Sequence, residues 1–168
     1  MCARPAAKSA MGGSSVARFL SKGVALSVMM ASNQALAFCW EEAASQHNIE
    51  PELLQAIAAV ESGFRAQAMN HANRNGTRDI GLMQINSIHL PRLLKQGITE
   101  ERLLTEPCLS VEVGASILAE FIQRFGYNWK AVGSYNAGTG SGPEREALRM
   151  QYAEKIWAYY EQLVAHRY

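Results

Sequence analysis

The helical spacing of apolar residues in the C-terminal half is the sequence feature that most constrains the fold. Val113, Ile117, Phe121 and Phe125 recur at every fourth position, and Gly126 follows the last of them. This spacing places side chains on one face of an α-helix, and a glycine commonly ends a helix. A second, longer helix is predicted near the C-terminus, where one face would carry Leu148, Tyr152, Ile156, Tyr159 and Leu163.

Residue types that begin or end helices and turns predict the remaining elements. Pro51 suits the first position of a helix that runs to Gly63, and Thr99 and Asn128 are residue types that cap helix N-termini. Residues 71–80 are polar and contain the turn signal Asn-Gly, and residues 81–86 are strand-like or irregular. We therefore expect a mainly α single domain with at most a minor β-hairpin.

The N-terminal 37 residues are typical of a secretory signal peptide. A basic stretch ends at Lys22, a nine-residue apolar run follows from Gly23 to Ala31, and Ala35-Leu36-Ala37 has the small-residue pattern of a cleavage site. The apolar run is too short to span a bilayer as a helix. The prediction is a cleaved leader over 1–37, a mature domain over 38–168, and a periplasmic location without a stable membrane span.

Composition and charge exclude several classes of protein. Apolar residues make up 48% of the chain and charged residues 18%, which is globular composition. Without the first 40 residues, 12 basic and 15 acidic side chains remain, a formal charge of −3. A mildly acidic domain is not expected to bind nucleic acid or an anionic membrane through bulk charge. Gly-rich residues 138–142 lack the lysine of a phosphate-binding loop.

Two cysteines remain in the predicted mature domain, Cys39 and Cys108. In an oxidising compartment they would form one disulfide, and two buried free thiols are the alternative. Neither cysteine has a neighbour at metal-ligand spacing, and the histidines at 47, 71, 89 and 166 are scattered. No metal site is expected.

Glu61 lies on what should be the inward face of its helix. Leu54, Ile57 and Ala58 form an apolar stripe, and Glu61 occupies the next position of the same series. A carboxyl group facing the core or a cleft wall should have a raised pKa, which suits a general acid for glycosidic-bond cleavage. The alternative is a last-turn glutamate that rotates into solvent.

Three sequence motifs, which follow one another along the chain, support the interpretation of Glu61 as a general acid. They are Glu61-Ser62-Gly63-Phe64, then GLMQIN over 81–86, then YNAG over 135–138. In this order, behind an export signal, they resemble the lysozyme-like lytic transglycosylases, particularly the small ones of secretion, pilus and conjugation systems. The resemblance implies a lysozyme-like fold, no cofactor, peptidoglycan glycan strands as substrate, and probable partners among the proteins of such an apparatus. A monomer is expected.

The resemblance also implies roles for individual residues. Glu61 would protonate the leaving glycosidic oxygen and then act as base. Gln84 and Asn86 would donate hydrogen bonds to the sugar, with turn formation as the alternative for both. The other candidate substrate-binding residues are Ser62, Met83, Tyr135, Asn136 and Tyr152. For Met83 and Tyr135 the alternative is core packing, and for Tyr152 core packing is favoured.

Asp79 is the only aspartate of the chain, and its presence leaves both transglycosylation and hydrolysis as candidate reactions. Residues 73–86 also resemble the second-carboxylate region of animal-type lysozymes, where an aspartate supports hydrolysis. The alternative, which we favour, is that Asp79 orders the Asn75-Gly76 turn or pairs with Arg74 or Arg78. The leading hypothesis is thus a transglycosylase that needs one carboxylate. A hydrolytic muramidase using Glu61 with Asp79 comes second, and a non-catalytic glycan-binding assembly protein comes third.

Overall fold

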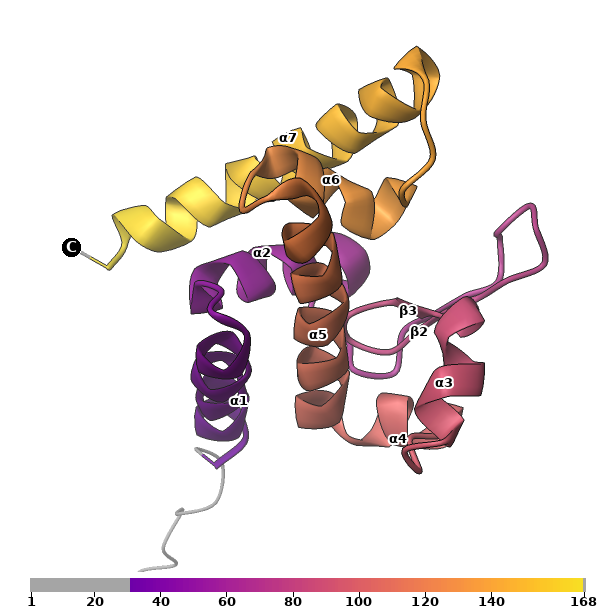
Figure 1. Cartoon of the computed structure of the whole chain (residues 1–168). Helices are drawn as coiled ribbons and strands as arrows, with labels where there is room; N and C mark the ends of the chain where they lie inside the picture. The colour runs from indigo at the N-terminus through magenta and orange to yellow at the C-terminus, as the bar shows by residue number, and fades with distance from the viewer. Residues whose placement is uncertain (1–30, 168) are drawn as a thin grey trace, which may run out of the picture.

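A computed structural model describes residues 31–167, with side chains from Cys39 onward, and this part of the chain is mostly helical (Figure 1). The helices are α1 (Ala31–His47), α2 (Pro51–Ser62), α3 (Leu90–Leu94), α4 (Glu100–Thr105), α5 (Pro107–Phe125), α6 (Trp129–Ala137) and α7 (Pro143–Ala165). A 3-10 turn, η1 (Ser87–His89), precedes α3. The predicted mainly α class is confirmed.

Local capping explains the helix boundaries. Gly63 ends α2 with a left-handed φ of 58°. The Thr99 hydroxyl accepts a hydrogen bond from the Arg102 amide at the start of α4, and the Asn128 side chain accepts from the Ala131 amide at the start of α6. These contacts satisfy backbone groups that a helix end leaves unpaired, so the three predicted boundaries are confirmed.

The β-structure is one strand larger than the predicted hairpin. Strands β1 (Met69–Asn70), β2 (Asp79–Ile80) and β3 (Ile85–Asn86) form an antiparallel sheet in that order. Asp79 lies opposite Asn70 on one side and Asn86 on the other. Each strand has two residues, so it carries no alternating pattern by which the sequence could have revealed the third.

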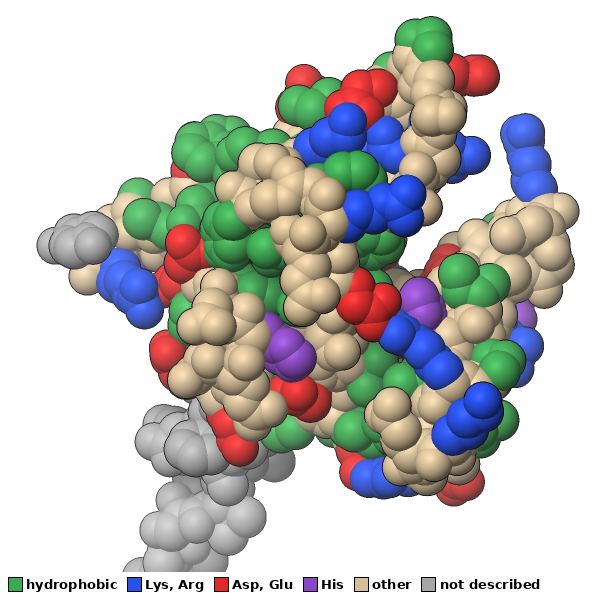
Figure 2. Space-filling view, viewed as in Figure 1, with side chains coloured by type: hydrophobic (Ala, Val, Ile, Leu, Met, Phe, Trp, Pro, Cys, Tyr) green, Lys and Arg blue, Asp and Glu red, His purple; other side chains and the backbone are tan. Residues whose placement is uncertain are grey.

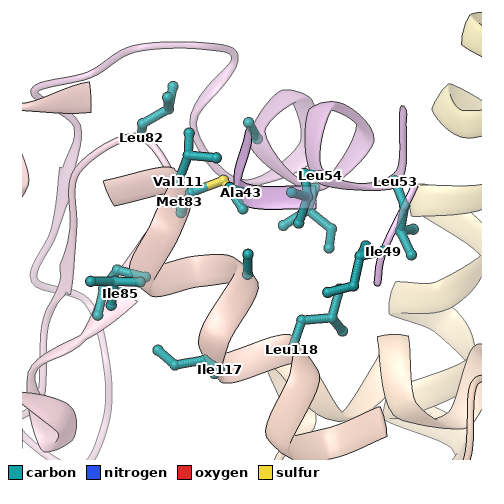
Figure 3. Packing of buried hydrophobic residues seen from close by; sticks show 14 of the residues in the cluster. Ala43, Ile49, Leu53, Leu54, Leu82, Met83, Ile85, Val111, Ile117 and Leu118 are labelled. Carbon is teal, nitrogen blue, oxygen red and sulfur yellow. The ribbon is translucent and has the colours of Figure 1, made fainter. Parts of the chain in front are cut away.

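The core lies around α5, which runs between α1 and the sheet in Figure 1. Figure 3 shows Leu118 and Ile117 of this helix among side chains from α2 and from the segment after β2. Met83 is fully buried there, against α5 at Gly114. The sheet is thereby anchored to the helical body.

The predicted stripe of α7 is only partly correct. Tyr152 and Ile156 are buried, whereas Leu148 is 45% exposed and Tyr159 is 47% exposed. Neither residue lies on an uncovered stretch of the helix, because the residue after each, Arg149 and Tyr160, packs against α6. Leu148 instead borders a pocket. The face of α7 that is buried is therefore set by how the helix is turned toward its partners, and not by the periodicity alone.

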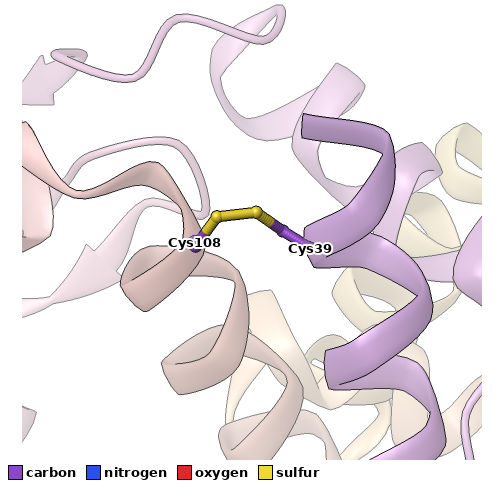
Figure 4. Close-up of a disulfide and its surroundings, with 2 residues drawn as sticks. All are labelled: Cys39 and Cys108. Atoms are coloured by element: carbon purple, nitrogen blue, oxygen red, sulfur yellow. A yellow bond between two sulfur atoms is a disulfide. The ribbon is translucent and has the colours of Figure 1, made fainter. Parts of the chain in front are cut away.

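Cys39 and Cys108 form the disulfide that the sequence suggested, and the alternative of two free thiols is wrong. It joins α1 to the first turn of α5 across 69 positions of sequence (Figure 4). Closing a loop of this length stabilises the fold by about 4 kcal/mol in the chain-entropy description.

Residues 1–30 of the predicted leader lie outside the described residues, and α1 runs through the predicted cleavage point after residue 37. The division into leader and mature domain stays a prediction. None of the helices within residues 31–167 has the length and the hydrophobicity that a membrane span requires.

Candidate active site

Glu61 occupies the last turn of α2, where the helix opens toward the sheet. The preceding residues of its face, Leu54, Ile57 and Ala58, are completely buried, and Glu61 is half-buried. Gly63 ends the helix two residues later, with its amide bonded to the Ala59 carbonyl. The carboxyl group is thus held at the edge of the core.

Tyr152 of α7 holds this carboxyl group in place. Its hydroxyl donates a 2.6 Å hydrogen bond to Glu61 Oε1, although 91 positions separate the two residues. Tyr152 is also a core residue, only 6% exposed. Tyr152 is therefore both a core residue and a contact of the candidate catalytic carboxyl group.

The surroundings raise the pKa of Glu61 from 4.5 to about 7. Burial is the largest cause, because an ionised carboxylate loses hydration there. The Tyr152 hydrogen bond lowers the pKa, and the negative charge of Asp79 raises it. A carboxyl group in this condition still holds its proton near neutral pH and can donate it.

Tyr135 of α6 lies beside the same carboxyl group. Its hydroxyl donates to the Met83 carbonyl at 2.9 Å. Burial, followed by the charges of Glu61 and Asp79, raises the pKa of Tyr135 well above 10, so the phenol stays protonated and neutral. Its contact ties α6 to the segment after β2.

Two pockets, of about 560 and 620 Å³, extend from this point in different directions. The residues that line both are Glu61, Asn73, Asp79, Gln84 and Asn136. Together they form a cleft with Glu61 at its middle. Figure 2 shows the surface hollowed between the α6–α7 side of the molecule and the loop that joins β1 to β2. A polymer chain can therefore extend to both sides of the carboxyl group.

Asp79 lies in the cleft, but its oxygens are occupied. Oδ2 accepts from the side-chain amides of Asn70 and Asn73 at 3.0 Å each, and Oδ1 accepts from Asn86 at 2.7 Å. The register of the sheet explains this cluster, because Asn70 and Asn86 are the cross-strand neighbours of Asp79. The expected pairing with Arg74 or Arg78 is wrong, since Asp79 forms no ion pair among the described residues and the Arg78 guanidinium pairs with Glu100.

Gln84 and Asn86 line the cleft with their amide nitrogens already bonded to the protein. Gln84 Nε2 donates to the carbonyls of Ala68 and Gly81 at 3.1 and 2.9 Å. Asn86 Nδ2 donates to Asp79, and its Oδ1 caps η1. Contacts within the protein thus occupy both amide nitrogens, which the prediction assigned to the sugar, and Asn86 Nδ2 also donates to Thr77.

Ser62 and Met83 differ from the predicted substrate-binding positions. Ser62 is 2% exposed, and its hydroxyl donates to the Leu82 carbonyl at 2.7 Å. Met83 is fully buried against α5 and is a core residue, not a wall of the cleft. Both are internal because the GLMQ segment folds under α2. By contrast, Asn136 is exposed on α6 and borders both pockets.

Three arginines line the cleft, Arg65, Arg74 and Arg145, and none was among the predicted site residues. Arg65 follows the end of α2, Arg74 lies in the polar loop after β1, and Arg145 lies on the first turn of α7. No periodicity marks an inward face at these positions. Among the described residues, no three His, Cys, Asp or Glu side chains are grouped to hold a metal ion.

Changes at Tyr152 and Asp79 should move the pH dependence of activity in opposite directions. Activity that needs protonated Glu61 should fall as pH rises through about 7. Tyr152→Phe removes a contact that lowers the pKa, so the fall should move to higher pH. Asp79→Asn removes a charge that raises the pKa, so the fall should move to lower pH.

The measurement is the rate of the catalysed reaction across pH for both variants. Tyr159→Phe, an exposed tyrosine on the same helix, is the matched control and should leave the profile in place. Shifts of both variants in the same direction would contradict this electrostatic account.

A helical domain whose cleft holds one desolvated carboxyl group has the general acid that an enzyme of glycosidic-bond cleavage needs. Residues 38–160 match the family described as the Transglycosylase SLT domain. Because the match covers most of the chain, the protein belongs to this family and is a peptidoglycan lytic transglycosylase.

The chain is also similar to individual proteins and to a solved structure. Invasion protein IagB of Salmonella typhimurium strain SL1344 is 52% identical over 135 residues, which are 80% of this chain and 82% of IagB. Protein IpgF of Shigella flexneri is 46% identical over 127 residues, covering 76% of this chain and 82% of IpgF. The solved structure of an inactive mutant of lytic transglycosylase Slt from Pseudomonas aeruginosa matches with a TM-score of 0.57 at 21% identity. That match covers 81% of this chain and 25% of the longer Slt chain, and it shows the common fold.

Proposed function

We propose that the protein cleaves the β-1,4 bond between N-acetylmuramic acid and N-acetylglucosamine without water, leaving a 1,6-anhydromuramyl end. The observation that carries this proposal is the contrast between the two carboxyl groups of the cleft. Glu61 is desolvated with a pKa of about 7, whereas Asp79 is held by three asparagine amides. Glu61 is thus suited to proton transfer, whereas the oxygens of Asp79 are occupied by hydrogen bonds that hold the β1–β2 loop and the sheet.

One residue is sufficient for both proton transfers. Protonated Glu61 gives its proton to the glycosidic oxygen, which leaves with the glucosamine. The resulting carboxylate then takes the proton of the muramyl C6 hydroxyl while that oxygen bonds to C1. Glu61 ends protonated, as it began, and the Tyr152 hydroxyl supports the ionised form between the two steps.

The hydrolytic alternative has one observation in its favour, which is that Asp79 borders both pockets together with Glu61. A muramidase would use water and would leave a reducing muramyl end. The two reactions therefore differ in product mass by one water molecule.

Mass spectrometry of the products tests the proposal. Incubating the purified protein with isolated peptidoglycan should release anhydromuramyl fragments, and a parallel Glu61→Gln sample should release none. Reducing muramyl ends in place of anhydro ends would refute transglycosylation and assign Asp79 to the reaction.

We further propose that the enzyme works in the periplasm, after removal of residues 1–37, and opens the wall locally for an envelope-spanning secretion or conjugation apparatus. The supporting points are the signal-like N-terminus, the peptidoglycan substrate of the family, and the similarity to a protein named for invasion. Cell fractionation tests the location, and protein that stays in the cytoplasm at full length would rule it out.

A further inference from the structure

All but one of the described arginines away from the cleft are neutralised by acidic neighbours, and the exception is Arg124. The pairs are Arg78–Glu100, Arg92–Glu120, Arg102–Glu106, Arg149–Glu146 and Arg167–Glu52. Arg124 lies 5.6 Å from the centre of the Phe125 ring. Pairing is the ordinary outcome for residues 41–168, where 15 carboxylates face 12 basic side chains.

The three arginines of the cleft, Arg65, Arg74 and Arg145, have no such acidic neighbour among the described residues. Arg74 and Arg145 line the same pocket, both are exposed, and within the described residues neither has a carboxylate at ion-pair distance. Arg145 Nη1 donates to the Ala137 carbonyl at 3.2 Å, a contact that orients the guanidinium and leaves its charge uncompensated. Two full positive charges therefore border this pocket, and Arg65, whose Nε donates to the Ser62 carbonyl, borders the other pocket of the cleft.

The two arginines come from different parts of the fold. Arg74 lies in the loop between β1 and β2, whereas Arg145 lies at the start of α7. Figure 2 shows blue side chains on both sides of the hollow between these segments. A ligand that fills this pocket meets a guanidinium from either wall.

We propose that Arg74 and Arg145 bind the free carboxylates of the peptide stems that branch from the glycan, so that the enzyme distinguishes anionic stems from amidated ones. This inference rests on the proposed function, since it assumes a peptidoglycan strand in the cleft. Guanidinium groups match carboxylates as two-pronged, charge-assisted partners. A carboxamide of the same size has no charge and turns an N–H donor toward the arginine donors.

Binding measurements separate this inference from catalysis. The protein would carry Glu61→Gln to prevent turnover. The probes would be soluble disaccharide–tetrapeptide oligomers with free stem carboxylates, and the same oligomers after carbodiimide coupling to ammonia. The anionic form should bind about tenfold more tightly, because each exposed ion pair contributes a factor of roughly two to five. The ratio should fall as salt is added.

Substitutions assign the effect to the two side chains. In the same background, Arg74→Gln with Arg145→Gln should reduce the ratio to about one, and the corresponding lysine pair should keep part of it by retaining charge. Arg124→Gln removes an exposed arginine outside the cleft and should leave the ratio unchanged.

Equal binding of both oligomers, or a full ratio in the double glutamine variant, would overturn the inference. Neither result depends on cleavage. If the unsubstituted enzyme made no anhydro product, the proposed function would fail while the binding ratio still decided this point.

Discussion

Replacing Glu61 with glutamine is expected to reduce peptidoglycan cleavage by about 10³- to 10⁴-fold, at the upper end of what general acid–base catalysis contributes. The effect should be this large because the same carboxyl group serves both proton transfers. Glutamine keeps the shape of the side chain and can still accept the hydrogen bond from Tyr152. The loss should therefore appear in the turnover number and not in substrate binding.

The same substitution should make the protein more stable at high pH. A carboxyl group whose pKa rises from 4.5 to about 7 on folding binds its proton more tightly in the folded state, so its ionisation disfavours folding. Between these two pH values the unsubstituted protein loses stability as pH rises. Below pH 4.5 both states are protonated and the penalty is absent. The full penalty, above pH 7, is about 3 kcal/mol.

Denaturant unfolding at about pH 4 and about pH 8 measures this effect. The variant and the unsubstituted protein should have similar unfolding free energies at the lower pH, and the variant should be more stable at the higher pH. A variant that was less stable at pH 8 would show that Glu61 is not desolvated in the fold.

Gly81→Ala is expected to destabilise the protein by about 3 to 4 kcal/mol, the sum of an unfavourable backbone conformation and overpacking. Gly81 has a φ of 75°, and its amide donates to the Ala68 carbonyl at 2.8 Å. An added Cβ would meet the Leu103 carbonyl oxygen at a separation that real Cβ atoms do not adopt. Since a backbone atom blocks the position, a side-chain rotation cannot relieve the clash.

Activity should fall with stability in this variant, because Gly81 begins the segment that supports the site. Leu82 accepts the Ser62 bond, Met83 accepts the Tyr135 bond, and Gln84 borders the cleft. Shifting the segment would move Tyr135 and the end of α2 together.

Gly76→Ala provides the matched control. Gly76 has the same φ of 75°, but no atom lies within 4 Å of its Cβ position. Its substitution should lower the unfolding free energy by only about 1 to 2 kcal/mol, the backbone contribution alone. Thermal or denaturant unfolding of both variants gives the comparison, and equal losses would show that the Leu103 contact is unimportant.

Short-range features of the fold could be predicted from the sequence. The ends of α2, α4 and α6 depend on a proline, a glycine or a capping side chain within four residues, and the inward face of α2 depends on spacing alone. Such contacts are local, so the sequence contains all the information that decides them. The position of Glu61 on an apolar face belongs to the same class.

Contacts between segments that are distant in the sequence decided where the other side chains of the site lie. Whether Tyr152 packs in the core or meets Glu61 depends on how α7 crosses α2, and the side chain does both. Ser62 and Met83 turned inward because the segment after β2 passes beneath α2 and against α5. Asp79 became a loop organiser because two strands place asparagines opposite it.

The sequence by itself determined the helical class, the helix ends and the carboxyl group suited to proton transfer, because spacing and capping act over a few residues. Only the tertiary structure decided how far the pKa of Glu61 rises, which polar groups are occupied by the protein, and which arginines remain unpaired at the cleft. These properties depend on desolvation and on partners far away in the chain, which exist only once the helices and the sheet have packed together.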